Sequence, residues 1–157
     1  MDVFSRTFLP AAAEAGVAIP TVSRHMPIFR RCVEPDDPTV LVIPCVSPDH
    51  PMAGDFLMLL TYRRLVITQE TRVLHRLRLH LNANLRHLSN VSWNPDLRAT
   101  AVEIAATAVD GVRERFRVRL HEPEQVWQVD SLLKHLFRGG RAAGLARRPA
   151  GVTPAAA

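Results

Sequence analysis

Cysteine is scarce in this 157-residue chain, which contains only Cys32 and Cys45. Two cysteines are too few for the disulfide framework of a small secreted domain. Long apolar runs are also missing, because none approaches the roughly 20 residues that cross a bilayer as a helix. The first residues lack the basic stretch and apolar core of a signal peptide. We therefore expect a reduced, cytoplasmic protein.

The motifs of common catalytic and cofactor sites are missing as well. The sequence has no glycine-rich phosphate loop, and none of its seven histidines has a cysteine or carboxylate at a spacing typical of zinc ligands. Cys45 and His50, with Asp49 beside them, form the one candidate pair of nucleophile and base. We expect a protein that is not an enzyme and uses no cofactor, metal or small-molecule substrate, with hydrolysis at Cys45 as a third-ranked alternative.

Lysine is nearly absent, since Lys134 is the only one among twenty basic residues, and the net charge is +5. The charge is uneven: residues 1–54 carry a net −2, whereas residues 55–138 carry +4 and residues 139–157 carry +3. A basic surface attracts nucleic acid and anionic lipid without specificity. The bias toward arginine is also typical of GC-rich coding, which weakens the argument that each arginine serves binding.

The chain divides by composition into three parts. Residues 1–38 contain five prolines and are expected to form an irregular or short-helical extension. A short helix around Val3–Ala15 fits the pattern, although Pro10 would disturb its middle; we expect Phe4, Phe8 and Leu9 to pack on the main domain. Residues 39–138 form that domain, and residues 139–157 are expected to be a disordered basic tail.

The main domain is predicted to contain seven strands and one helix. The β-branched runs and alternating patterns that favour strands lie at residues 39–46, 56–61, 64–69, 72–81, 84–93, 99–109 and 113–120. From Glu122 the period changes to that of a helix over residues 122–138. The apolar side chains that share one arc of this helix are Val126, Val129, Leu132, Leu133, Leu136 and Phe137. Trp127 falls at the edge of that arc.

The alternation in the last two strands predicts their pairing. Ile104 and Phe116 both belong to the apolar face of their strands, and directly paired residues must point to the same face. A three-residue loop ending in a left-handed Gly111 satisfies this condition. It pairs Ile104 with Phe116 and places Glu103 opposite Arg117, in an exposed ion pair worth at most about 1 kcal/mol.

Two rows of basic side chains follow from the same alternation. In residues 72–81, Leu77 and Leu79 are expected inside, which places Arg76, Arg78 and His80 outside. The second row consists of Arg113, Arg115, Arg117 and Arg119. Each row has two interpretations: a surface for phosphates or acidic headgroups, or a solvated sheet face shielded by long arginine stems. No exposed aromatic residue is expected between these arginines, so a platform for base stacking is missing.

Three stretches resemble the bacterial pleckstrin-homology-like (PH-like) and GRAM-like proteins. They are "FLMLLTYRRLVITQ" at 56–69, "LRHLSNVSW" at 85–93, and "VEIAATAVDGVRERFRVRL" followed by "VWQVDSLLKHLF". The resemblance implies a seven-stranded, antiparallel, partly open barrel of mainly β class, capped by the C-terminal helix. It also implies a phosphoinositide site near the first strand connection. Here that connection, residues 47–55, has no lysine or arginine, and its Asp49 and Asp55 would repel phosphates, so we do not expect one.

We therefore expect a non-enzymatic PH-like binding or scaffold module. Its predicted partner is a protein or peptide, including another copy of itself in a homo-oligomer, because sheet edges can accept a further strand. The alternative is weak electrostatic binding to nucleic acid or an anionic membrane. The residues that would form that surface are Arg76, Arg78, Arg113, Arg115, Arg117 and Arg119.

Overall fold

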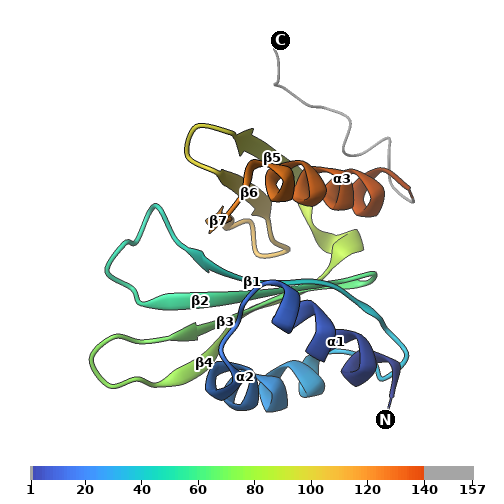
Figure 1. Ribbon diagram of the computed structural model, residues 1–157, viewed down its shortest axis with the longest axis vertical. Helices are drawn as coiled ribbons and strands as arrows, with labels where there is room; N and C mark the ends of the chain where they lie inside the picture. The colour runs from blue at the N-terminus through green and yellow to red at the C-terminus, as the bar shows by residue number, and fades with distance from the viewer. Residues whose placement is uncertain (1, 140–157) are drawn as a thin grey trace. The chain divides into compact units, whose positions relative to one another are not determined.

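A computed structural model of the chain describes residues 2–139. These residues form two compact units that divide between Leu85 and Arg86. The predicted disordered tail lies outside the described residues, apart from its first residue, Gly139. Figure 1 labels the helices and strands of both units and colours them by residue number.

The first unit is a four-stranded sheet with two helices on one face. Its elements are α1 (Val3–Glu14), α2 (Ile19–Cys32), β1 (Thr39–Val46), β2 (Asp55–Thr61), β3 (Arg64–Glu70) and β4 (Leu77–Asn84). The strands are antiparallel in the order β4-β3-β2-β1. The β1–β2 and β3–β4 connections therefore lie at the same end of this sheet, as Figure 1 shows.

Both N-terminal helices contain an interior proline, including Pro10, which we expected to disturb the first helix. Asp2 caps α1 by accepting a 2.7 Å hydrogen bond from the Ser5 amide, and α1 continues through Pro10. The sequence did not predict α2. Its first turn contains Pro20, at a position where the backbone N–H has no partner within the helix. It also contains Pro27 in its interior.

Both helices bury aromatic side chains against the sheet. Phe4, Phe8 and Phe29 are at most 1% exposed, and the ring of Phe8 lies 5.7 Å from that of Phe29. They share a core cluster with buried residues of β1, β2 and β3 that include Leu59. Burial of each ring contributes about 1.5–3 kcal/mol. The predicted packing of Phe4 and Phe8 is confirmed, but Leu9 is 40% exposed, so that expectation is wrong.

The fourth strand differs from the prediction in position and in facing. It begins at Leu77, since residues 72–74 form a turn, and it has a bulge because Leu81 pairs with Ile67 whereas Leu79 pairs with Thr68. A bulge shifts the side-chain alternation by one residue. Leu79 and Leu81 therefore lie on opposite faces, and Leu79 is 44% exposed rather than buried.

The second unit is a three-stranded sheet covered by a helix. It contains β5 (Ser89–Asp96), β6 (Ala101–Thr107), β7 (Arg113–Arg119) and α3 (Pro123–Gly139), with β6 in the middle of the sheet. The strand predicted over residues 84–93 is partly wrong, because the short 3-10 helix η1 (Leu85–His87) precedes β5.

The β6–β7 hairpin has the predicted register. Ile104 pairs with Phe116 and Glu103 pairs with Arg117. Gly111 is left-handed at φ 86°, and its amide donates a 2.9 Å hydrogen bond to the Ala108 carbonyl. Ile104 and Phe116 are 5% and 2% exposed, so their predicted burial is confirmed.

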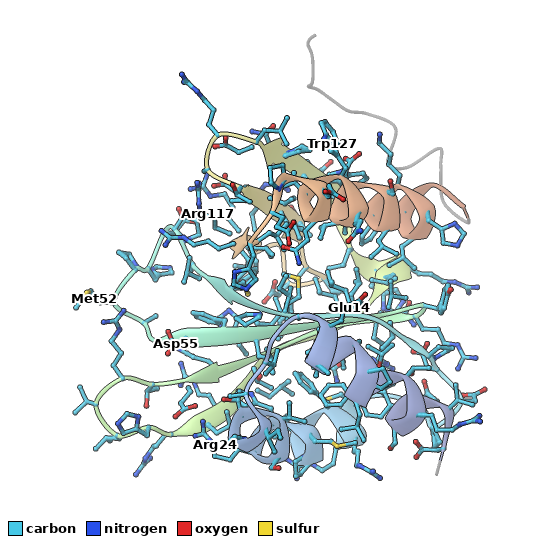
Figure 2. The ribbon with its side chains drawn as sticks, viewed as in Figure 1. Glu14, Arg24, Met52, Asp55, Arg117 and Trp127 are labelled. Carbon is cyan, nitrogen blue, oxygen red and sulfur yellow. The ribbon has the colours of Figure 1, made fainter. Side chains whose placement is uncertain are left out.

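Helix α3 packs on β5 and β6 through the predicted apolar arc. Val126, Val129, Leu133 and Phe137 are buried, whereas Trp127 is 52% exposed (Figure 2). Trp127, predicted at the edge of the apolar arc, therefore lies outside the buried face of the helix.

A tryptophan from β5 packs against this helix instead. The ring of Trp93 lies 6.1 Å from the ring of Phe137, and its Nε1 donates a 2.8 Å hydrogen bond to Asp130, which is 6% exposed. Seven antiparallel strands, a C-terminal helix and N-terminal helices confirm the predicted PH-like, mainly β fold class.

Candidate functional site

Strand β4 occupies an outer position in the sheet of the first unit, and among the described strands β3 alone pairs with it. The Thr71 amide donates a 2.9 Å hydrogen bond to the Arg76 carbonyl, so Thr71 and Arg76 form a hydrogen-bonded pair. Such pairs alternate with pairs whose backbone groups point away from each other. The N–H and C=O groups of Leu77 and Leu79 therefore point outward, whereas those of Arg78 point toward β3.

The leucines of β4 lie on the helix-covered face of the sheet. Leu79 pairs with Thr68, and the Thr68 hydroxyl contacts His25 of α2 at 2.6 Å. Leu77 pairs with Glu70 on the same face. Leu77 is half-buried and Leu79 is exposed, so this edge offers an apolar surface beside α2.

The arginines of the first predicted row lie on the opposite face. Arg78 pairs with Gln69, and its Nε donates a 2.9 Å hydrogen bond to the Gln69 side chain. Arg76 precedes the strand by one residue and, two positions before Arg78, faces the same way. Both arginines are exposed. The structure thus brings Arg76 and Arg78 together, while His80 occupies the bulge and its ring contacts Phe56 at 5.1 Å.

The charge along this edge has one sign. Residues 71–85 contain Arg72, Arg76 and Arg78 and no aspartate or glutamate. The nearest preceding acid, Glu70, accepts a 2.8 Å hydrogen bond from Arg24 of α2. Arg24 already pairs with Glu70 on β3, and β4 itself contains no acidic residue. No acid on this strand therefore neutralises Arg76 and Arg78.

A polar cluster fixes α2 beside this edge. Hydrogen bonding to Arg24 lowers the pKa of Glu70, whose other oxygen lies 3.9 Å from His25 Nε2. Burial lowers the pKa of His25, as does the charge of Arg24 to a smaller degree, and Glu70 opposes both. His25 is only 3% exposed, so we infer that it is neutral near pH 7.

Sequence reasoning missed this cluster entirely. His25 and Glu70 are 45 residues apart, and the helix that carries His25 was not predicted. The prolines at positions 20 and 27, on either side of Arg24 and His25, favoured an irregular segment instead of a helix. The contact exists because α2 lies across β3.

The second arginine row makes several contacts within its own unit. Arg115 Nη1 lies 3.3 Å from Glu103, and Arg117 lies 3.9 Å from both Glu103 and Asp96. Arg113 donates hydrogen bonds to the Asn90 carbonyl and to the Thr107 and Ser92 hydroxyls. The predicted Glu103–Arg117 ion pair forms, but the shorter one joins Glu103 to Arg115.

The remaining sequence candidates gain no support as sites. Cys45 is 4% exposed on β1, and burial raises the pKa of its thiol strongly, which disfavours the reactive thiolate. No group of three or more metal-ligating residues occurs within residues 2–139. In the β1–β2 connection, the Ala53 carbonyl accepts a 2.7 Å hydrogen bond from Gln69.

Strand β5 is also an outer strand of its own sheet, but it is protected. It contains Pro95, which cannot donate a backbone hydrogen bond, and its register is irregular between Ser89 and Ser92. The Asn90 carbonyl of this strand already accepts a 2.9 Å hydrogen bond from Arg113. Prolines and bulges are the devices with which proteins block edge pairing. Strand β4 contains no proline and keeps exposed leucine beside its outward backbone.

Comparison with solved structures supports the fold. The hSac2 domain from human phosphoinositide phosphatase Sac2 matches with a TM-score of 0.53 and 11% identity, over 86% of this chain and 92% of that chain. At this identity the likeness shows a shared fold and nothing further. No protein-family model matches the chain, and no curated protein does.

Two weaker likenesses are to longer chains. The complex of PDZ-RhoGEF DH/PH domains with activated RhoA matches at a TM-score of 0.46 and 16% identity, over 66% of this chain. Vav1 bound to an allosteric inhibitor matches at 0.43 and 13%, over 76%. This chain spans only 30% and 33% of those two chains. Among the described helices, none has the length and hydropathy needed to cross a bilayer.

Proposed function

We propose that this protein is a non-enzymatic binding module that accepts an extended segment of another protein or peptide as an added strand on β4. The observation that carries the proposal is the outward-pointing backbone of Leu77 and Leu79 at an outer strand without proline. Backbone hydrogen bonds provide the affinity in this mode of recognition, and pockets for alternate side chains provide the specificity. We further propose membership of the bacterial PH-like and GRAM-like group and a cytoplasmic location.

The contrast between β4 and β5 supports this choice. A long exposed edge without protection is a risk of aggregation. In the second unit, β5 contains a proline and an irregular register. Strand β4 of the first unit also has a bulge and an arginine, but it contains no proline. Because β4 lacks the proline of β5, it is the less protected of these two strands and the better candidate for strand addition.

Selection from a library of random 12-residue peptides tests the proposal. Peptides enriched on the wild-type chain should bind it and should lose at least tenfold in affinity for Leu79→Asp. The matched control is Val109→Asp, because Val109 is 78% exposed in the β6–β7 turn of the other unit. If no enriched peptide binds, or if both variants weaken binding equally, the proposed edge is wrong.

Electrostatic binding to nucleic acid or an anionic membrane is the second candidate, and the positive net charge of +5 favours it. It predicts affinity for duplex DNA or phosphatidylserine vesicles that falls steeply between low and moderate salt. Replacement of both Arg115 and Arg117 by Ser should weaken that binding. Binding that survives this double replacement would remove the second arginine row as the surface responsible.

A further inference from the structure

The two faces of the β4 edge offer different chemistry to an incoming strand. On the α2 side the edge presents Leu77 and the exposed Leu79, and on the opposite side it presents Arg76 and Arg78. A strand that adds to β4 continues the sheet, so its own side chains must also alternate between these faces. Every second side chain of the partner therefore meets leucine, and the others meet arginine.

We propose that the partner of β4 is an extended segment in which acidic and apolar side chains alternate. This inference rests on the proposed function and adds the chemistry of the partner. Carboxylates placed opposite Arg76 and Arg78 form cross-strand pairs of opposite charge, which stabilise an antiparallel pairing. Apolar side chains on the other face cover Leu79 and remove it from water.

The same charges disfavour a second copy of this chain as the occupant. Antiparallel pairing of β4 with β4 of another molecule would place the Arg76 and Arg78 side chains of both copies on one face of the joint sheet. Like charges on facing strands are destabilising. Residues 71–85 contain no acid that could compensate. A partner with negative charge is therefore favoured over self-association through this edge.

The backbone geometry also determines which amides of the partner matter. Because the N–H and C=O groups of Leu77 and Leu79 point outward, an antiparallel partner forms hydrogen-bonded pairs with these two residues. Directly paired residues share a face, so the partner residues opposite the leucines are the apolar ones. Their amides should donate to β4, and the amides of the acidic residues should point away from it.

Three synthetic ten-residue peptides test the chemistry with the full chain. The first alternates Glu and Val, the second has the same composition in two blocks of five, and the third alternates Lys and Val. We expect the first to bind at least tenfold more tightly than either of the others by isothermal titration calorimetry. The double variant Arg76→Glu/Arg78→Glu should reverse the preference toward the Lys–Val peptide. The variant Arg30→Glu/Arg31→Glu has the same charge change on α2 and should not reverse it.

Backbone N-methylation of the Glu–Val peptide separates this inference from the proposed function. Methylation of the Val amides should abolish binding, whereas methylation of the Glu amides should leave it within about threefold. If Val methylation abolishes binding but the three unmethylated peptides bind alike, strand addition stands and the acidic–apolar assignment is overturned. If both methylated forms bind as well as the parent peptide, strand addition at β4 is overturned too.

Discussion

The side chain of His25 on α2 lies against Thr68 on β3, with Nδ1 2.6 Å from the threonine hydroxyl, and both residues are buried. Glu70, two residues further along β3, joins the same helix through its hydrogen bond to Arg24. These contacts link the N-terminal helices to the strand next to the candidate edge. A loss of this polar cluster should therefore be measurable in the stability of the whole first unit.

Stability should fall as the pH drops below about 6.5, and His25 should account for part of the fall. Burial lowers the pKa of His25 in the folded state from the ordinary 6.5, so the unfolded chain takes up the proton first and gains stability relative to the native state. His25→Asn retains a polar group but cannot be protonated. Its free energy of unfolding in urea should change less between pH 7.5 and 5.5 than that of the wild type.

Glu70 does not confound this measurement. Its pKa is lowered from 4.5 by hydrogen bonding to Arg24, so its stabilising contribution is lost only at lower pH, below the window used. Equal pH dependence of the wild type and His25→Asn would show that His25 does not carry the effect.

Gly54 should be harder to replace than Gly111. Both glycines have positive φ, 111° and 86°. A Cβ at Gly111 meets nothing nearby, so Gly111→Ala should cost only the strain of a left-handed alanine, about 1–2 kcal/mol. A Cβ at Gly54 would collide with the backbone of Glu70, so Gly54→Ala should cost more. Urea unfolding of the two variants checks the order, and a smaller loss for Gly54→Ala would contradict it.

The two tryptophans should differ sharply in their contribution to stability. Trp93→Phe removes the hydrogen bond to the buried Asp130, and a buried acceptor that loses a partner costs about 1–3 kcal/mol. Trp127→Phe changes a half-exposed side chain and should remain within about 0.5 kcal/mol of the wild type. Chemical denaturation followed by circular dichroism compares them, and equal losses would show that Asp130 does not depend on Trp93.

Only one of the two thiols should react in the native protein. Cys32 is partly exposed, whereas Cys45 is buried and burial raises its pKa strongly. Ellman's reagent should therefore modify one thiol per chain in buffer and two in denaturant, and Cys32→Ser should react only in denaturant. Rapid native reaction of the Cys32→Ser variant would show that Cys45 is accessible and would reopen hydrolysis at Cys45.

The β6–β7 hairpin shows how much the sequence can determine when its alternation is uninterrupted. Ile104 and Phe116 share the parity of their apolar neighbours, and one glycine in the turn allows a single loop length. The register follows from these two facts alone and agrees with the structure. The helix over residues 122–138 was predictable for the same reason, because its apolar arc is continuous.

The strand that carries the candidate site was less predictable. The alternation at Leu77, Leu79 and Leu81 favours one apolar face, but the bulge at His80 moves Leu81 to the other side. Nothing in the local sequence marks this bulge, because it depends on how β4 pairs with β3. Likewise, no local pattern indicates that Arg24 neutralises Glu70.

By itself, the sequence determined the number and order of most strands, the capping helix, the final hairpin register and the excess of arginine. Those features depend on residue type and spacing within a few positions. The tertiary structure alone decided which edge is open, which faces Leu79 and Arg78 occupy, and where α2 lies. Each of these depends on pairing between segments far apart in the chain, where one inserted residue reverses the side on which every following side chain lies.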